Sequence, residues 1–416
     1  MPDQRRTSPR PGTHRWWRPR FRHPAQVIVA AFAAALAVGT VLLLLPMARA
    51  GPDDAPVLVA LFTATSAVCV TGLIVVDTPV YWSAFGQVVI LALIQVGGFG
   101  IMTLASLVGL LISRRLGLRS RLIAAAETKH VGLGDVGQVV VGVIKFSVLF
   151  ETLTAALLTL RFLIGYDEPL PRAASLGVFH AISAFNNAGF ALFSDNLIGF
   201  ADDPWICLPI AAAVILGGIG FPVLFELRRR LRHPGQWSLH SRLTLGMTLV
   251  LLVASTGFLT LAEWSNPKTL GALDSSDRLL AGFFNATMLR TAGFNSIDVA
   301  GLAPGSMLGS DVVMFIGGGS AGTAGGIKVT TCVLLLFVIW AEVRGDAEVT
   351  VLDRRVEPRV WRQALSVALL SVAAVVLAAF TLVEISGFSF DAVLYETVSA
   401  FATVGLSTGI TAQLPV

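Results

Sequence analysis

The sequence predicts an all-α polytopic membrane protein built from four tandem span–pore–span repeats around a central axis, with the fourth repeat incomplete at the C-terminus. Three observations predict this fold. Of the 416 residues, 55% are hydrophobic and only 13% are charged, and the mean hydropathy is +0.76, far from the composition of soluble domains. The apolar residues gather in runs long enough to cross a bilayer. One short glycine-containing motif recurs four times along the chain.

Seven apolar runs are long enough to cross the ~30 Å hydrocarbon core, which takes ~20 residues of helix. The first run follows a basic segment and precedes Ala48-Arg49-Ala50, a pattern that also occurs at secretory cleavage sites. We expect a retained helix, because the run exceeds the ~7–15 apolar residues of a signal peptide and each later repeat begins with an equivalent span. The predicted spans are 25–47, 82–112, 139–163, 205–227, 243–263, 311–340 and 364–385.

The recurring motif is a short apolar segment that ends in a glycine. Its four copies read SAVCVTGL from Ser66, SAFNNAGF from Ser183, TMLRTAGF from Thr287 and SAFATVGL from Ser399. Each copy follows a stretch that can form a half-length helix and precedes a polar loop, so each repeat is expected to run span, pore helix, glycine loop, span. The predicted segments are a basic N-terminus at 1–24 and repeats at 25–115, 139–230, 240–344 and 359–416.

Basic residues predict the orientation in the membrane through the positive-inside rule. The segments between repeats, together with the N-terminus, carry 23 of the 30 lysines and arginines. The N-terminus is therefore expected to be cytoplasmic and the glycine loops to open outward. Carboxylates on the outer face would raise the local concentration of cations. Those expected there are Asp53, Asp54, Asp77, Asp167, Glu168, Asp195, Asp202, Asp203, Asp274, Asp277, Asp298 and Asp391.

The glycine loops predict an ion pathway. Non-helical backbone at membrane depth is tolerated only where it is buried in protein or lines a wet cavity, and glycine permits close approach and unusual backbone angles. Four such loops around one axis would form rings of carbonyls, which replace the hydration shell of potassium in selectivity filters. The sequence thus predicts a potassium-channel-like central pore. The predicted filter residues are Val70, Thr71, Gly72, Asn187, Ala188, Gly189, Thr291, Ala292, Gly293, Thr403, Val404 and Gly405.

The span after each of the first three glycine loops has a glycine cluster of its own, at Gly97–Gly100, Gly217–Gly220 and from Gly317 onward. Close helix packing explains the first two clusters. The third contains no large side chain up to Gly326, so it is expected to break the helix and form a mobile gate beneath the filter. Its G-x-G-x-x-G pattern lies in span sequence without a βαβ unit, which argues against dinucleotide binding. The predicted gate residues are Gly317, Gly318, Gly319, Ser320, Ala321, Gly322, Thr323, Ala324, Gly325, Gly326 and Lys328, the last a cation near the inner end of the path.

These features resemble the membrane subunit of the Trk/Ktr/HKT superfamily of potassium uptake systems, and most closely a Ktr-type subunit. The resemblance rests on four repeats with one filter glycine each, on RTAGF at Arg290–Phe294 and on the glycine-rich interruption in repeat three. It covers about residues 25–410. It implies potassium at the filter carbonyls of Thr71, Ala188, Ala292 and Val404 and a gate at 317–326.

The same resemblance implies the setting in which the chain works. We expect a homodimer with one pore per subunit, surrounded by lipid in a bacterial cytoplasmic membrane. A cytosolic nucleotide-binding regulatory ring of the RCK type is the expected partner, and nucleic acid is not. Potassium is the expected substrate, sodium is a candidate activator, and no resident cofactor is expected.

The fourth repeat departs from the family pattern. The sequence stops at Val416, shortly after Gly405 and before a second span. A conserved arginine of the family belongs to that helix and cannot be assigned here. We expect the functional protein to be longer by ~30–40 residues, enough for one more span.

Several buried-looking residues have more than one interpretation. Glu151 lies mid-span, where a carboxylate belongs either to an ion path or interface or to a buried structural pair, and Glu396 in the fourth pore helix is similar. Arg290 is expected to brace the third loop through hydrogen bonds to carbonyls, because a cation in the path would repel potassium. Cys69, Cys207 and Cys332 are too far apart in sequence to predict a disulfide framework or metal cluster and are interpreted as packing residues.

No Ser/His/Asp arrangement, paired carboxylate or metal-ligand spacing predicts an enzyme. Two transport mechanisms stay open: a channel-like potassium conductor, and a sodium-coupled symporter working by alternating access. Alternating-access carriers commonly use inverted repeats, whereas these repeats are parallel. The parallel arrangement favours the conductor. A purely structural partner of another channel is a third possibility, and the four filter sequences argue against it.

Overall fold

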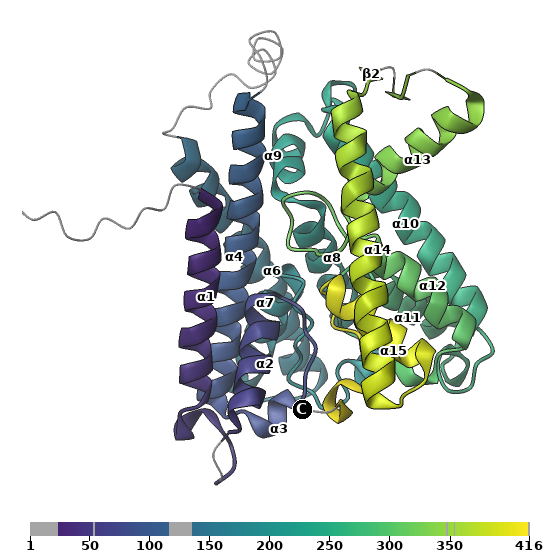
Figure 1. Ribbon diagram of the computed structural model, residues 1–416. Helices are drawn as coiled ribbons and strands as arrows, with labels where there is room; N and C mark the ends of the chain where they lie inside the picture. Colours follow the sequence, from purple (N-terminus) through teal and green to yellow (C-terminus); the bar gives the residue numbers. More distant parts are fainter. Residues whose placement is uncertain (1–23, 53–54, 116–134, 347, 353, 415–416) are drawn as a thin grey trace, which may run out of the picture.

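The computed structural model describes residues 24–52, 55–115, 135–346, 348–352 and 354–414. Long helices alternate with short ones, and in Figure 1 several of the long helices run roughly along one direction. The helices are α1 (Pro24–Leu43), α2 (Val57–Val68), α3 (Thr78–Tyr81), α4 (Ala84–Arg115), α6 (Asp135–Gly165), α7 (Leu170–Phe185), α8 (Pro204–Ile219), α9 (Phe221–Arg230), α10 (Leu239–Glu263), α11 (Ser275–Met288), α12 (Pro304–Phe315), α13 (Val329–Arg344), α14 (Pro358–Ser386) and α15 (Phe390–Phe401). Most of the predicted N-terminal segment, and the arginines and lysine at 119–129, lie outside the described residues.

Each predicted apolar run is helical over most of its length, and the bilayer explains why. Four described helices are long and apolar enough to cross a membrane, and α8 with α9 makes a fifth if the bent pair is one span. In hydrocarbon every backbone N–H and C=O must be paired within the segment, which a continuous helix achieves. The chain is therefore a multi-pass helical membrane protein.

Two of the predicted spans are broken, and only the second break was predicted from the sequence. The run predicted at 205–227 bends by 100° between α8 and α9, and Gly220 at the bend has a φ of 98°, a conformation that a side chain would disfavour. Helix packing alone was therefore the wrong interpretation of Gly217–Gly220. The run predicted at 311–340 is interrupted between α12 and α13, as its glycines predicted. In Figure 1 these two helices lie apart, joined by an irregular segment.

The first glycine cluster behaves as the packing interpretation predicted. Helix α4 continues through Gly97–Gly100 without a break. A Cβ at Gly97 would lie 2.1 Å from the carbonyl oxygen of Val68, and one at Gly98 would lie 1.9 Å from the Asn186 Oδ1. These glycines let α4 approach Val68 and Asn186, which lead into the first and second glycine loops.

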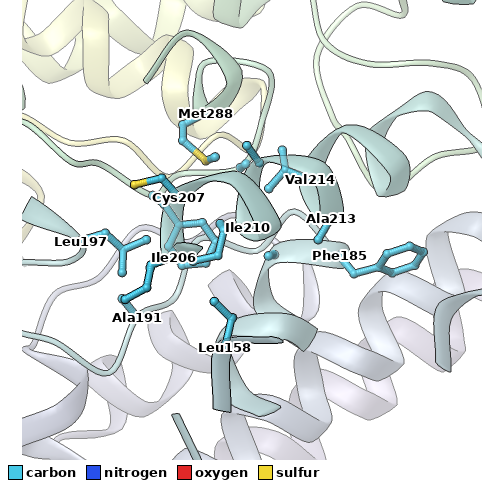
Figure 2. Packing of buried hydrophobic residues seen from close by; sticks show 14 of the residues in the cluster. Leu158, Phe185, Ala191, Leu197, Ile206, Cys207, Ile210, Ala213, Val214 and Met288 are labelled. Atoms are coloured by element: carbon cyan, nitrogen blue, oxygen red, sulfur yellow. The ribbon is translucent and has the colours of Figure 1, made fainter. Parts of the chain in front are cut away.

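The largest buried cluster surrounds α8. Figure 2 shows Ile206, Ile210 and Val214 of α8 packed among side chains from neighbouring helices, including Phe185 and Met288 from the ends of α7 and α11. This packing fixes two of the short helices relative to each other. Cys207 belongs to the cluster, which confirms a packing role for it, whereas Cys69 is exposed and all three cysteines are free thiols.

One small feature was not predicted from the all-α pattern. Strand β1 (Thr350–Val351) pairs antiparallel with β2 (Arg354–Arg355) in the connection between α13 and α14. This hairpin lies at the same end of the molecule as the C-terminal end of α9 (Figure 1). That end carries the described loops between the predicted repeats.

Candidate functional site

The four glycine loops share one backbone conformation. In each loop the glycine has a positive φ, and so does the residue two positions before it. Such angles are uncommon for residues with a side chain, and their recurrence at equivalent positions means that the surrounding structure imposes them. The φ values are 52° and 85° at Val70 and Gly72, 58° and 70° at Asn187 and Gly189, 67° and 70° at Thr291 and Gly293, and 51° and 92° at Thr403 and Gly405.

The loops meet in a closed ring, a result that sequence spacing alone could not supply. A Cβ added to each glycine would strike the carbonyl oxygen of the residue that precedes the next glycine. The distances are 2.3 Å from Gly72 to Ala188, 2.7 Å from Gly189 to Ala292, 2.4 Å from Gly293 to Val404 and 2.3 Å from Gly405 to Thr71. Because contacts below 3.0 Å exclude a side chain, only glycine fits at these four positions. The ring brings together all four predicted filter triplets.

A short helix leads into each loop of the ring. Helices α2, α7, α11 and α15 each end four or five residues before the glycine of their loop. The C-terminal end of a helix carries the equivalent of roughly half a negative charge. Four such ends close to one ring make it attractive to a cation.

Local hydrogen bonds hold the loops against their own helices. The amide of the residue before the glycine donates to a carbonyl in the last helical turn, as in Thr71 N to Ser66 O and Ala188 N to Ser183 O, both 2.8 Å. In the first two loops the serine side chain adds a bond to the carbonyl just after the glycine: Ser66 Oγ donates to Leu73 O and Ser183 Oγ to Phe190 O, both at 2.8 Å. The residues are thus placed by bonds that leave the ring carbonyls unobstructed.

A cavity of about 450 Å³ lies against one side of the ring. Three of the four ring glycines, Gly72, Gly189 and Gly405, contribute to its wall. Asp77 and Asp195 also line it, and Asp77 accepts a hydrogen bond of 2.6 Å from Ser194 Oγ. Two of the predicted outer carboxylates therefore stand at a mouth that opens onto the glycines, whereas Asp53 and Asp54 lie outside the described residues.

The glycine-rich segment, residues 317–326, packs against the other side of the ring. A Cβ at Gly325 would lie 2.3 Å from both Ala402 O and Thr403 Oγ1. Thr323 Oγ1 donates to Asn187 Oδ1 at 2.9 Å. The segment thus contacts the second and fourth glycine loops, and none of its residues is among those that line the cavity.

The same segment also packs against the bend between α8 and α9. Gly319 N donates to Gly218 O at 2.8 Å, and Phe221 N donates to Ala321 O at 3.2 Å. A Cβ on Gly220 would lie 2.3 Å from Ser320 O. Backbone groups of the second glycine cluster, Gly217–Gly220, therefore contact and hydrogen-bond the third cluster. Lys328 Nζ bonds Ala324 O within the segment.

Buried polar groups surround the ring. Glu151 is 6% exposed and accepts bonds of 3.1 Å from Gln95 Nε2, to each of its oxygens, and from Asn186 Nδ2. It therefore forms a buried structural network beside the second loop. Arg290 is also buried, but it donates to Thr248 Oγ1 at 3.2 Å, and it makes no bond to a loop carbonyl in the described part of the chain. The expected brace through carbonyls was wrong, because the side chain turns back towards α10.

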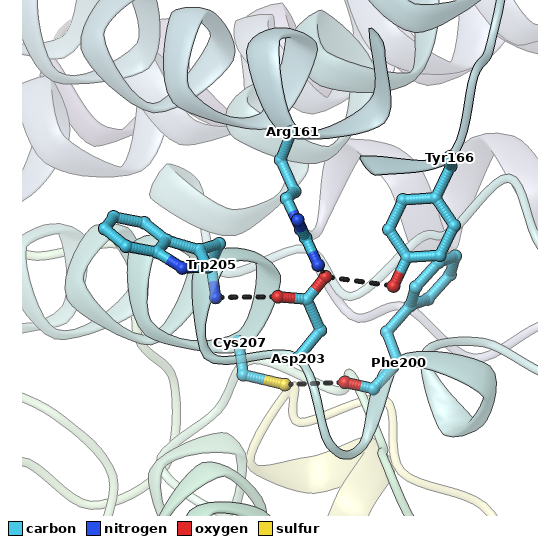
Figure 3. A network of polar contacts seen from close by, with 6 residues as sticks. All are labelled: Arg161, Tyr166, Phe200, Asp203, Trp205 and Cys207. Carbon is cyan, nitrogen blue, oxygen red and sulfur yellow. Dashed lines mark hydrogen bonds and ion pairs between the residues drawn. The ribbon is translucent and has the colours of Figure 1, made fainter. Parts of the chain in front are cut away.

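Another polar network lies at the C-terminal end of α6. Asp203 Oδ2 accepts from Arg161 Nε at 2.7 Å and from Tyr166 OH at 2.9 Å, and its Oδ1 caps α8 through Trp205 N at 2.9 Å (Figure 3). Burial and the Asp203 carboxylate raise the pKa of Tyr166 to about 12. The phenol therefore stays protonated in the folded protein, and its contribution to stability is lost only as the pH rises from about 10 through 12.

Comparison with known proteins identifies the family. The family model for TrkH, described as a cation transport protein, matches residues 8–416.

The chain belongs to the TrkH family of cation transport proteins.

Two potassium uptake proteins are similar to this chain over most of their length. The Ktr system potassium uptake protein B of Bacillus subtilis (strain 168) is 40% identical over 94% of this chain and 87% of its own. The protein of the same name from Vibrio alginolyticus is 36% identical over 94% and 85%. The crystal structure of the potassium transporter TrkH from Vibrio parahaemolyticus aligns with a TM-score of 0.74 and 17% identity, covering 98% of this chain and 80% of that one. The predicted family is confirmed.

Proposed function

We propose that this TrkH-family chain is the potassium-conducting membrane subunit of a Ktr-type uptake system. The ring of Thr71, Ala188, Ala292 and Val404 carbonyls carries the proposal. Carbonyl rings replace the hydration shell of potassium, and four helix C-terminal ends add negative potential at the same point. The names of the Bacillus and Vibrio relatives support potassium as the ion.

The proposed architecture is four span–pore–span repeats around this ring. The equivalent conformation of the four loops, each preceded by a short helix, supports a channel-like conductor rather than inverted repeats with alternating access. The cavity with Asp77 and Asp195 is then the outer mouth, and the N-terminus is cytoplasmic. Potassium is the cargo, sodium is a candidate activator, and the chain is assigned no resident cofactor.

The glycine-rich segment is the proposed gate. It lies on the inner side of the ring, where an ion leaving the carbonyls would meet it. Backbone hydrogen bonds to the α8–α9 bend, rather than large apolar side chains, hold it there. A segment with so little apolar contact can open at modest free-energy cost.

The proposed partners follow from the Ktr resemblance and from charge. A cytosolic nucleotide-binding ring would dock on the basic inner face, which comprises Arg114, Arg115, Arg228–Arg230, Arg354 and Arg355. Arg228–Arg230 end α9 and are exposed. A homodimer within the lipid bilayer is the proposed assembly.

The test is ion selectivity in proteoliposomes. The chain should conduct potassium in preference to sodium, and Gly72→Ser should lower that preference, because the added Cβ would lie 2.3 Å from the Ala188 carbonyl in a left-handed conformation that serine resists. Gly235→Ser, at a position with open space around it, is the matched control. Equal permeability of the unaltered chain to both ions, or an unchanged ratio in a folded Gly72→Ser protein, would refute the filter assignment.

A further inference from the structure

Three filter loops are tied to their pore helices by buried side chains of three different types. In the second, third and fourth loops, a polar side chain eight or nine residues before the glycine accepts a hydrogen bond from the amide three residues after it. His180 Nε2 accepts from Leu192 N at 3.2 Å, Asn285 Oδ1 from Ser296 N at 3.4 Å, and Glu396 Oε1 from Thr408 N at 3.0 Å. The three side chains are at most 5% exposed.

The chemistry of each side chain suits this bond. His180 Nδ1 lies 2.8 Å from Leu176 O, so Nδ1 carries the hydrogen and Nε2 is left as the acceptor. Asn285 adds a bond from Nδ2 to Ser296 Oγ at 2.9 Å. In the first loop the residue nine before the glycine is Thr63, which makes no such bond to Val75 within the described residues.

Glu396 makes the most extensive of these connections. Its two oxygens accept from Ser407 Oγ, from Thr408 N and Oγ1 at 3.0 and 3.4 Å, and from Thr411 Oγ1 at 2.8 Å. A carboxylate offers acceptors only, and every contacting group is a donor. Ser407 and Thr411 line the outer cavity, while Glu396 stands behind them and does not line it.

We propose that His180, Asn285 and Glu396 are positioning residues for ion selection, which hold the outer end of the filter at the spacing that potassium requires, with Glu396 dominant. The inference rests on the proposed function, because it assumes that the ring selects potassium. A carbonyl ring discriminates between ions through its dimensions and the field of its dipoles. Bonds that fix the backbone just beyond the glycines restrict both.

The experiment compares Glu396→Leu and Glu396→Gln in proteoliposomes. Leucine removes all the acceptors, and the potassium-to-sodium permeability ratio should fall by about tenfold, as for the loss of one or two net hydrogen bonds. Glutamine keeps one carbonyl oxygen for Thr408 N, so it should restore most of the ratio, to within about threefold. Thermal stability in detergent is measured for each variant.

Glu263→Leu is the matched control. Glu263 is also buried and accepts from Thr269 Oγ1 at 2.6 Å and Ala303 N at 3.0 Å, but it lies at the end of α10, outside the glycine loops. The Glu263→Leu substitution should lower thermal stability without changing the permeability ratio. An equal loss of selectivity in Glu263→Leu would assign the Glu396 effect to general destabilisation and overturn the proposal.

A second variant covers the case in which Glu396→Leu does not fold. His180→Phe keeps a buried ring of similar shape but leaves Leu192 N without its acceptor, and the ratio should fall by about threefold. Ratios within twofold of the unaltered chain in every variant that folds would overturn the proposal. Failure of the unaltered chain to prefer potassium would refute the proposed function instead.

Discussion

Thr323→Val is expected to raise potassium flux by weakening the contact between the glycine-rich segment and the second filter loop. Thr323 Oγ1 donates to Asn187 Oδ1 at 2.9 Å, and Asn187 is 1% exposed. Valine preserves the shape of threonine but removes the hydroxyl. Loss of one buried hydrogen bond costs about 1 kcal/mol. If the bond exists only while the segment lies beneath the ring, the open population should rise about fivefold.

Thallous-ion flux into proteoliposomes measures the effect without the regulatory subunit. Thr381→Val is the matched control, because among the described residues Thr381 Oγ1 bonds only Leu377 O of its own exposed helical turn, at 2.8 Å. Deleting residues 320–325 should raise flux further and reduce dependence on any regulatory partner. Unchanged or lower flux in a folded Thr323→Val protein, together with the same result for the deletion, would refute the argument and leave 317–326 as a packing feature.

Two further predictions concern the inner and outer faces. Arg229→Glu, on the exposed end of α9, should weaken co-purification of the proposed cytosolic ring. Lys268→Glu, on the predicted outer face, is the control and should not. Undiminished co-purification of the ring with both variants would count against the docking surface. Asp203→Ala should lower stability by about 1–2 kcal/mol, mostly through loss of the α8 cap because the ion pair with Arg161 is partly solvated. Asp203→Asn, which can still cap the helix, should lose less in thermal unfolding, and equal losses would contradict the capping argument.

The sequence determined the membrane-spanning character and the positions of the four ring glycines. Long apolar runs become helices in a bilayer because only a helix pairs every backbone group within a single segment. The sequence reveals the four ring glycines because only glycine tolerates both a positive φ and a carbonyl within 3 Å. The residue type alone therefore marks these positions, which are Gly72, Gly189, Gly293 and Gly405. The run from Gly317 to Gly326 predicted an interrupted helix for another reason, because it has no large side chain and glycine has a low helix propensity.

Only the tertiary structure decided which groups meet. The closure of the ring joins Gly405 to Thr71, near opposite ends of the chain, and no local pattern encodes that contact. The α8–α9 bend at Gly220 was hidden because a glycine in an apolar run fits a packed helix as well as a broken one. Glu396, Glu151 and Arg290 were recognised as unusual in the sequence, but a buried polar side chain takes its role from its partners, and those come from other segments of the fold.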